Sequence, residues 1–462
     1  MATATVTPGT QLSGWRLTAF STLMVTISGA AFPLTAYLPA FYAQYHGIAL
    51  GTVGLVFALV RILDTLWDPL VGHLSDRSRS RFGRRRIWIM IGLPIYVIAT
   101  WLTFMPAANV GPVYLAACLL LIYGSWTMLQ IPYYAWSGEI SGHYHERTRV
   151  QAYLGVAGAV GLMLVLSVPT LLDQIGHAAQ DAKVAAMGWF IIATAVIGGT
   201  LTLTSFGEAP PPPPGKPLGF VNALRLLAGE PLLVRVLLSD FAVTIGQTAR
   251  GTLMLFFFAQ YMNLGAAVSL MFTLQYTFGI IASPIWLRIG YRLGKHRALV
   301  LGEVLQALIN LSLMLVTPGG IVLLAILTIA QGLTQSSGNL MLRAIVSDVA
   351  DKQLLETGTD RAGLLFSVFG LSMKAGNAVA IGFVLPLVAW LGFKASGPND
   401  ADSLFALKCV FALVPFAAHT LSALIMLRFP LDAARHAQIR DALEARGAEP
   451  KVQVILPQEV AP

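Results

Sequence analysis

Long apolar runs follow one another along almost the whole chain, separated by short polar segments. Each of these runs reaches the length of about 20 mostly apolar residues that a helix needs to cross a bilayer. There are twelve: 17–45, 48–74, 86–106, 112–138, 149–171, 185–206, 233–262, 264–289, 297–317, 320–349, 361–391 and 401–428. Backbone groups cannot stay unpaired in lipid, and the alternation typical of barrel strands is absent. The pattern therefore predicts an all-α membrane protein with twelve transmembrane helices.

Composition supports a membrane protein and excludes most soluble classes. Of the 462 residues, 56% are hydrophobic and 11% are charged, whereas soluble domains carry about 25% charged residues. A soluble enzyme is thereby excluded, and we find no Walker loop or other enzyme motif. The net charge of +8 is better explained by basic loops beside an anionic membrane surface than by nucleic-acid binding.

Loop charge predicts the orientation and the division of the chain. Loops after even-numbered helices are basic, most clearly residues 76–86, and loops after odd-numbered helices carry few Lys or Arg. This asymmetry places both termini in the cytoplasm, and the short loops suit a bacterial inner membrane. The predicted parts are a cytoplasmic N-terminus (1–16), a six-helix bundle (17–206), a proline-rich cytoplasmic linker (207–232), a second six-helix bundle (233–428) and a cytoplasmic tail (429–462), which begins as a short surface helix.

The two halves repeat each other weakly. Residues 81–86 (RFGRRR) follow the second helix, and residues 292–297 (RLGKHR) follow the eighth helix at the equivalent place. Two parallel six-helix repeats are the layout of the major facilitator fold, in which substrate binds near the membrane midplane. A generic twelve-helix channel or membrane enzyme is the alternative. The paired basic loops favour the two-repeat fold over this alternative.

Charged residues within the second helix indicate an ion site. Arg61, Asp64 and Asp68 are spaced three and four residues apart and share one face. Two carboxylates one turn apart repel each other unless a cation or a proton lies between them. The pair is therefore a candidate site for a coupling ion, Na⁺ or H⁺, with no metal expected beyond Na⁺. An internal salt bridge from Arg61 is the other interpretation, and we expect both because one arginine cannot satisfy two carboxylates.

Two further cations lie deep in predicted spans. At its depth in the membrane, Lys374 needs a carboxylate or a polar substrate as a partner. Either Asp64 or Asp68 could be that partner when no substrate is bound. Arg250 lies near the midplane, where its guanidinium could hold a carboxylate, phosphate or sulfate. A salt bridge from Arg250 to Asp240 is the alternative, although about 15 Å of helix separates them.

Other polar positions suggest gating and substrate contacts. Asp76, Arg77, Arg343 and Asp348 lie near helix ends and, with Arg61, are expected in a gating or charge network; Glu303 is interpreted as a gate or packing group. The fourth predicted helix carries Trp126 and Tyr134 beside Thr127 and Gln130, a combination that suits stacking on sugar rings or other flat amphipathic ligands. Ordinary helix packing or an interfacial aromatic belt is the alternative.

These motifs resemble the glycoside–pentoside–hexuronide:cation symporters, the melibiose permease family of the major facilitator superfamily. The similar segments are 61–72, 80–86, 130–134, 347–351, 357–363 and 374–376, and the resemblance covers most of residues 17–428. It implies that Asp64, Asp68 and Thr127 bind the coupling cation and that Lys374 belongs to the same charged network.

The chain also departs from that family. Trp67 stands where sodium-selective members have asparagine, which makes protons a plausible coupling ion. Gln130 and Tyr134 replace an aspartate and a tryptophan of the sugar-binding members, residues 26–29 offer no acid in the first helix, and Leu154 lies where a sugar-binding arginine is expected. The ion-binding residues of the family are thus retained, and its sugar-binding residues are largely replaced. A lysophospholipid-transporting branch of the broader family shows that an amphipathic substrate is mechanically feasible.

The sequence predicts a secondary transporter, not an enzyme. The expected function is symport of a glycoside-like or other small polar or amphipathic solute with H⁺ or Na⁺ by alternating access, without a cofactor. The expected substrate contacts are Gln130, Tyr134, Trp126, Arg250 and Lys374, and the expected partners are the solute and the lipid bilayer around a monomer. The alternatives are transport of an amphipathic anion or lysophospholipid held by Arg250, and a non-transporting scaffold or sensor, which has no need for a buried acid pair.

Overall fold

The computed structural model describes residues 12–140, 144–176, 179–208, 229–358 and 361–445. Within these residues twelve helical segments are long and apolar enough to cross a membrane, so all twelve predicted spans are confirmed. The first half of the chain contains α1 (Gly14–Phe32), η1 (Pro33–Tyr37), α2 (Leu38–Tyr45), α3 (Leu50–Arg77), α4 (Arg86–Phe104), α5 (Pro112–Glu139), α6 (Tyr144–Gly176) and α7 (Gln180–Ser205). The second half contains α9 (Pro231–Phe256), η2 (Phe257–Tyr261), η3 (Gly265–Ala267), α10 (Val268–Leu293), α11 (Lys295–Ser312), η4 (Leu313–Leu315), α12 (Ile321–Thr357), α13 (Ala362–Trp390), α14 (Ala401–Met426) and α15 (Ala433–Ala445).

Helix α12 extends beyond the predicted span 320–349. The added turns are polar, and Lys352 lies 2.9 Å from Glu356 one turn later. An i,i+4 pair of this kind supports a helix outside the apolar layer, which a hydropathy criterion does not detect. Gly358, with φ +67°, ends the helix in the left-handed conformation that glycine adopts without steric cost.

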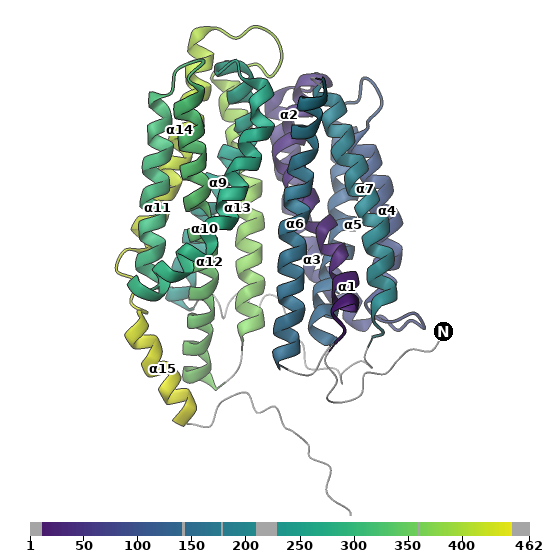
Figure 1. Ribbon diagram of the computed structural model, residues 1–462, viewed down its shortest axis with the longest axis vertical. Coiled ribbons are helices and arrows are strands. Elements are labelled where there is room, and N and C mark those ends of the chain that lie inside the picture. The colour runs from purple at the N-terminus through teal and green to yellow at the C-terminus, as the bar shows by residue number, and fades with distance from the viewer. Residues whose placement is uncertain (1–11, 141–143, 177–178, 209–228, 359–360, 446–462) are drawn as a thin grey trace, which may run out of the picture.

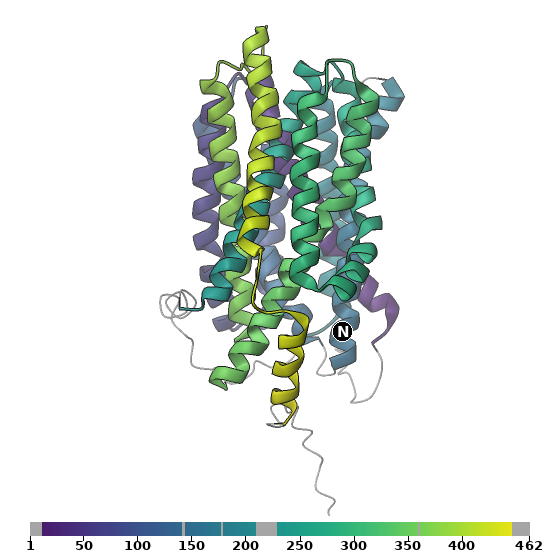
Figure 2. The same cartoon turned by 90° about the vertical axis from the view of Figure 1, so that its left-hand side faces the viewer.

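The helices are arranged as two bundles that stand side by side. In Figure 1 the bundle of α1–α7, coloured purple to teal, lies beside the bundle of α9–α14, coloured green to yellow, with long axes roughly parallel. The surface helix α15 projects from the lower end of the second bundle, as Figures 1 and 2 show, and His436 of α15 contacts Asp351 of α12 at 3.0 Å. The predicted short surface helix is confirmed, whereas most of the predicted linker, including 210–214, and the end of the tail lie outside the described residues.

Helices α3 and α13 bring the two bundles into close contact. A Cβ atom added to Gly54 of α3 would lie 2.9 Å from Leu385 Cβ, and one added to Gly382 of α13 would lie 2.5 Å from Ala58 Cβ. Both positions therefore require glycine for the observed approach. Small residues at helix crossings are how membrane helices gain packing contacts without a hydrophobic driving force. The crossing fixes α3 against α13 a few turns from Asp64 and Lys374.

An aromatic cluster joins the bundles at a second place. The ring of Phe32, at the end of α1, lies 4.6 Å from that of Phe272 and 5.1 Å from that of Tyr276, both on α10. The adjoining Tyr37 hydroxyl donates to Ser269 Oγ at 3.5 Å. Edge-to-face contacts at these separations are favourable, so the first helix of one bundle is closed against the second bundle here.

Candidate substrate and cation sites

A charged cluster ties the two bundles together. Lys374 Nζ of α13 lies 2.9 Å from Asp64 Oδ2 and 2.7 Å from Asp68 Oδ2 of α3. Arg61 Nη1 lies 3.2 Å from the same Asp64 oxygen. The Asp64 side chain is 3% exposed and that of Asp68 is 22% exposed, so the pair spans a gradient from buried to accessible. The expected salt bridge of Arg61 and the expected partnership of Lys374 with the acids both occur.

Helix α5 completes the cluster from the other side. Thr127 Oγ1 lies 3.2 Å from Asp64 Oδ1 and 3.0 Å from Asp68 Oδ1. The hydroxyl therefore bridges the two carboxylates through the oxygens that Lys374 leaves free. The guanidinium of Arg61 lies over the Tyr123 ring at 4.2 Å from its centroid, a cation–π contact that holds it beside Asp64.

The cluster is electrically balanced. Arg61 and Lys374 supply two positive charges against the two carboxylates. A further cation would give the site an excess charge in a medium where unbalanced charge is costly. Entry of a coupling ion between the carboxylates thus requires that the Lys374 ammonium move away or that a negative group arrive with the ion.

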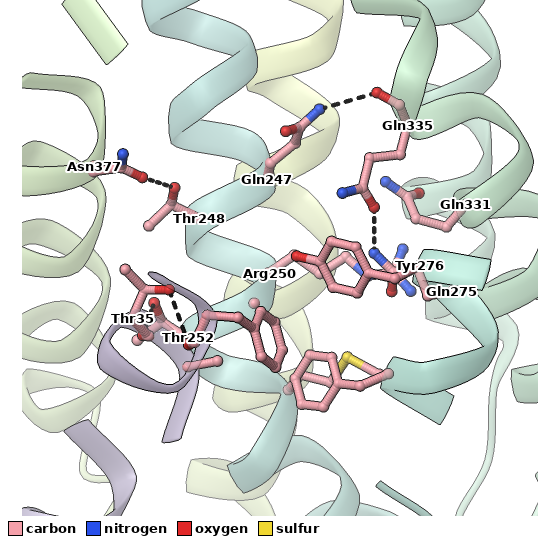
Figure 3. Close-up of a pocket in the computed structure, with 15 residues that line it drawn as sticks. Thr35, Gln247, Thr248, Arg250, Thr252, Gln275, Tyr276, Gln331, Gln335 and Asn377 are labelled. Carbon is pink, nitrogen blue, oxygen red and sulfur yellow. Dashed lines mark hydrogen bonds between the residues drawn. The ribbon is translucent and has the colours of Figure 1, made fainter. Parts of the chain in front are cut away.

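A cavity of about 180 Å³ lies between the first helix and the second bundle. Its walls share a polar character, since side-chain amides and hydroxyls outnumber rings. Figure 3 shows these side chains converging on the cavity; the lining residues are Phe32, Thr35, Ala36, Gln247, Thr248, Arg250, Gly251, Thr252, Met254, Phe272, Gln275, Tyr276, Gln331, Gln335 and Asn377.

Arg250 is the cationic group in the cavity wall. Its side chain is buried, with 2% of the residue exposed, and its Nη1 donates to Asn310 Oδ1 at 3.5 Å. Its Nε and Nη2 have no hydrogen-bond partner among the described residues, and no ion pair to Asp240 or another described acid is formed. A buried guanidinium without a counterion is expensive. The free N–H groups beside a cavity are therefore suited to a bound anion.

Helices α9 and α13 connect the cavity to the charged cluster. Thr248 of α9 donates its hydroxyl to Asn377 Oδ1 of α13 at 2.5 Å, and both residues line the cavity. Asn377 follows Lys374 by three residues, so the two lie about one turn apart on α13. A solute in the cavity thus lies next to the helix that carries the amine of the cation cluster.

The predicted aromatic contacts on the fourth predicted helix lie elsewhere. Trp126, Gln130 and Tyr134 of α5 are absent from the lining of this cavity. Trp126 stacks on Tyr123 with ring centroids 6.2 Å apart, and the Tyr134 hydroxyl faces Met24 Sδ at 3.6 Å. Their role in substrate binding stays a prediction, as does that of Arg250, which lines the cavity.

The predicted charge network divides into local clusters. Asp76 pairs with Arg85 at 2.5 Å within the first bundle, and Asp348 pairs with Lys295 at 2.6 Å within the second. Arg77 and Arg343 are exposed. Glu208, which follows α7, accepts backbone N–H groups of the basic loop at the start of α4, including that of Arg85 at 2.8 Å.

Most of the cavity lining was not identified from sequence. The missed residues are amides, hydroxyls and a tyrosine on apolar helices, such as Gln247, Gln275, Gln335 and Asn377. Polar side chains in membrane helices are used for contacts between helices or around cavities, so their concentration on α9, α10 and α12 was the available indication.

Comparison with known proteins identifies the family. The family model described as MFS/sugar transport protein matches residues 19–433. The glucuronide carrier protein homolog of Escherichia coli is 23% identical, covering 91% of this chain and 93% of the relative. The sodium-dependent lysophosphatidylcholine symporter 1 of Mus musculus is 23% identical, covering 92% and 88%. The crystal structure of the nucleoside transporter NupG shares the fold, with a TM-score of 0.64 and 14% identity over 91% of this chain and all of that one.

Because the family model spans most of the chain, the protein belongs to the MFS/sugar transport protein family. The predictions of family, major facilitator fold and transport are confirmed, and the protein is a multi-pass membrane transporter, not an enzyme.

Proposed function

We propose that this member of the MFS/sugar transport protein family is a cation-coupled symporter of a small polar solute. The observation that carries the proposal is the cluster in which Lys374 of one bundle is held by Asp64 and Asp68 of the other. The similarity to the sodium-dependent lysophosphatidylcholine symporter 1 of Mus musculus supports ion coupling. Both termini are proposed to lie in the cytoplasm, on the side of the basic loop.

The cluster supports coupling because the ammonium and the coupling ion compete for the same oxygens. Without an ion, Lys374 balances the carboxylates and ties α13 to α3. An ion that occupies the carboxylates releases Lys374 and α13 from this contact. Because Asn377 on α13 lines the cavity, release of the helix changes the solute site. Differential binding of the ion to two arrangements is what shifts their populations.

The oxygens available at the cluster favour one coupling ion over the other. Asp64, Asp68 and Thr127 supply carboxylate and hydroxyl oxygens, but Trp67 is exposed on α3 and has no oxygen to contribute. A proton needs one carboxylate, whereas Na⁺ needs a shell of several oxygens. We therefore favour H⁺ as the coupling ion, with Na⁺ as the competing outcome.

A negatively charged solute is the second candidate, favoured by the free N–H groups of Arg250. A carboxylate in the cavity would supply the missing counterion. The neighbouring amides and hydroxyls suit a sugar, and the small cavity suits one ring. Monosaccharide glycosides that do or do not carry a carboxylate, such as methyl β-D-glucuronide and methyl β-D-glucoside, are therefore the appropriate matched probes.

Uptake into liposomes tests the proposal. The reconstituted protein should concentrate a radiolabelled member of a panel of glycosides, glucuronides, pentosides and small organic anions when an inward proton gradient is imposed. Asp64→Asn should abolish this concentration while leaving downhill exchange measurable. Asp402→Asn, which alters an exposed acid at the start of α14, is the matched control and should behave as the wild type. Gradient-driven accumulation by Asp64→Asn would contradict the proposal, and a Na⁺ requirement would replace the proton.

A further inference from the structure

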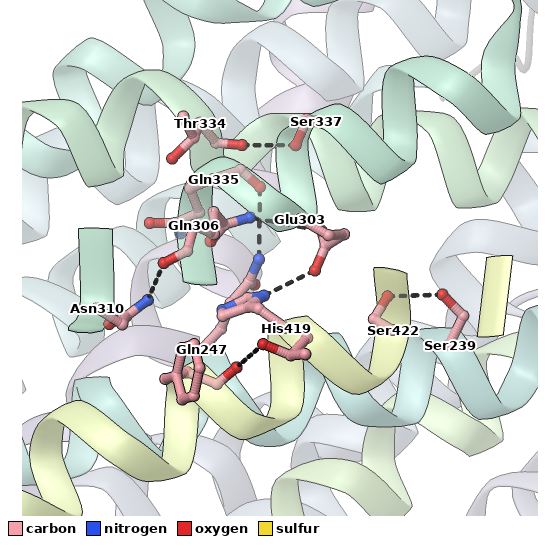
Figure 4. A network of polar contacts seen from close by, with 12 residues as sticks. Ser239, Gln247, Glu303, Gln306, Asn310, Thr334, Gln335, Ser337, His419 and Ser422 are labelled. Atoms are coloured by element: carbon pink, nitrogen blue, oxygen red, sulfur yellow. Dashed lines mark hydrogen bonds and ion pairs between the residues drawn. The ribbon is translucent and has the colours of Figure 1, made fainter. Parts of the chain in front are cut away.

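A second buried acid–base pair lies inside the second bundle, away from the charged cluster. His419 Nδ1 of α14 lies 2.7 Å from Glu303 Oε2 of α11, and both side chains are 0% exposed. Figure 4 shows the pair surrounded by helices of the same bundle. Ionisable side chains at such positions in membrane proteins are costly and commonly functional.

Two glycines make room for the pair. A Cβ atom at Gly338 of α12 would lie 2.6 Å from Glu303 Oε1, and one at Gly246 of α9 would lie 2.9 Å from His419 Nε2. The pair is therefore fitted between α9, α11, α12 and α14. A side chain at either glycine would push one partner away from the other.

The geometry defines where a proton can bind. An ionised carboxylate only accepts hydrogen bonds, so neutral His419 must carry its hydrogen on Nδ1 to bind Glu303. The lone pair then lies on Nε2, and this atom has no hydrogen-bond partner among the described residues. His419 Nε2 is thus a free proton acceptor beside Gly246, and Gly246 is followed directly by the cavity residue Gln247.

A chain of side-chain amides links Glu303 to Arg250. Arg250 Nη1 donates to Asn310 Oδ1 at 3.5 Å, and Asn310 Nδ2 donates to Gln331 Oε1 at 3.3 Å. Gln331 Nε2 donates to Gln306 Oε1 at 2.9 Å, and Gln306 Nε2 donates to Glu303 Oε1 at 3.5 Å. Every amide accepts on one side and donates on the other, so the chain runs from a cation to an anion without a reversal. Polarised chains of this kind transmit a charge change at one end to the other.

Charge balance links the two ends of this amide chain, Arg250 at one end and Glu303 with His419 at the other. With His419 neutral, the negative charge of Glu303 and the positive charge of Arg250 sum to zero across the chain. An anionic solute at Arg250 leaves the buried region with one uncompensated negative charge. A proton on His419 Nε2 restores neutrality.

We propose that Glu303 and His419 form a proton-binding site that takes up one proton when an anion binds at Arg250. The site is distinct from the Asp64–Asp68 cluster and rests on the proposed function only in taking the cavity as the solute site. It makes anion binding proton-linked within the second bundle, whichever ion the other cluster uses.

Other titratable and charged groups lie on the helices packed around the pair. On α9, Asp240 and Arg250 lie six residues before and four residues after Gly246, and Asp240 is the competing buried acid, with 2% exposed. The others are Arg235 of α9, Tyr276, Arg288, Tyr291 and Arg292 of α10, Lys295, His296 and Arg297 of α11, Arg343, Asp348, Asp351, Lys352 and Glu356 of α12, Lys374 of α13, and Asp402, Lys408 and Cys409 of α14. Among the described residues, none of these groups forms a hydrogen bond or ion pair with Glu303 or His419.

Solid-state NMR of ¹⁵N-histidine-labelled protein in liposomes tests the site with and without a solute. The signal missing from His419→Gln identifies the residue, and its ring shifts distinguish the neutral Nδ1–H form from imidazolium. From about pH 8 down to about pH 5, the window in which histidine titrates, addition of methyl β-D-glucuronide should convert His419 to imidazolium at a higher pH than in its absence. A His419 that stays neutral throughout, or charged throughout, would overturn the proposal.

Calorimetric binding in buffers of different ionisation enthalpy counts the protons. Wild-type protein should take up one proton per methyl β-D-glucuronide, with affinity falling about tenfold per pH unit once the site has lost its proton. Methyl β-D-glucoside should bind without uptake. Glu303→Gln and His419→Gln should abolish the uptake, whereas Asp240→Asn and the packing control Ser422→Ala, which removes a buried hydrogen bond on α14, should retain it.

The outcomes separate the two proposals. Proton uptake that persists in Asp64→Asn while gradient-driven transport is lost supports both. Transport unaffected by Asp64→Asn, with normal His419 titration, contradicts the proposed cation site alone. Anion binding without proton uptake, titration of His419 that ignores the anion, or failure of the glucuronide to bind at all overturns the linkage.

Discussion

Lys374, which is half-buried, and Arg250, which is buried, are two cations of the same bundle, and their surroundings are opposite. Lys374 contacts two carboxylates of the other bundle, at 2.9 and 2.7 Å. Arg250 has one long hydrogen bond to an amide and two nitrogen atoms without a hydrogen-bond partner in the described part of the chain. Under the proposed function, the first cation must give up its counterions for an ion to bind. The second has no counterion among the described residues, and a bound anionic solute would supply one. A charge deep in the bundle is thus suited to competing with an ion when it is already paired, and to binding a solute of opposite charge when it is unpaired.

The largest effect is expected at the unpaired cation. Arg250→Gln should weaken methyl β-D-glucuronide binding by about 100-fold or more, because losing one partner of a desolvated charge pair costs about 2–5 kcal/mol. Methyl β-D-glucoside affinity should change by much less. Equilibrium binding to detergent-solubilised protein measures both. Arg250→Lys, which keeps the charge but not the fork of donors, should fall between; equal losses for both glycosides would mean that Arg250 only supports the fold.

A smaller effect of opposite sign is expected at the paired cation. Lys374→Gln removes the ammonium that competes for Asp64 and Asp68 and leaves the cluster with a net negative charge. Affinity for the coupling ion in the absence of solute should rise, by about tenfold if the change amounts to about 1.4 kcal/mol. Ion-dependent thermal stabilisation of the purified protein measures this affinity. Unchanged or weaker ion binding would show that Lys374 does not occupy the ion's position.

The smallest effect concerns the connection between the two sites. Thr248→Val removes the hydroxyl that donates to Asn377 while retaining the side-chain shape. The enhancement of solute binding by the coupling ion should fall about fivefold, since a single hydrogen bond contributes about 1 kcal/mol. Solute titrations with and without the ion give this ratio. Thr420→Val, which removes only a hydroxyl bound to its own helix, is the control. An equal loss of the enhancement in Thr420→Val would show that the effect does not depend on the α9–α13 contact.

The sequence predicted the paired site better than the unpaired one. Asp64 and Asp68 lie one turn apart on one helix, so local geometry alone brings them together, and the resemblance to a family added Thr127 and Lys374. The twelve spans could also be predicted from the sequence, because the length of an apolar run decides them. The polar extension at the end of α12 could not be predicted in this way, because its helicity depends on pairs such as Lys352–Glu356.

Residues that meet only through tertiary packing escaped prediction. Glu303 and His419 are 116 positions apart, and neither has a charged neighbour on its own helix face that would reveal the other. The cavity amides are likewise spread over four helices. Interpretation of Glu303 as a gate or packing group stays open in the absence of a test, but its contact with a histidine gives it a chemistry that spacing could not indicate.

The first helix of each bundle contains one wide turn, and this feature has mechanical consequences. Pro33–Tyr37 and Phe257–Tyr261 are π-helical; the first lies within its span and is followed by α2, whereas the second ends its span. Wide turns of this kind interrupt the regular ladder of helical hydrogen bonds and recur at functional positions. Each is therefore a point at which its helix can bend more easily than at the regular turns around it. A bend at Pro33–Tyr37 would reorient α2, whereas a bend at Phe257–Tyr261 would reorient the connection to α10.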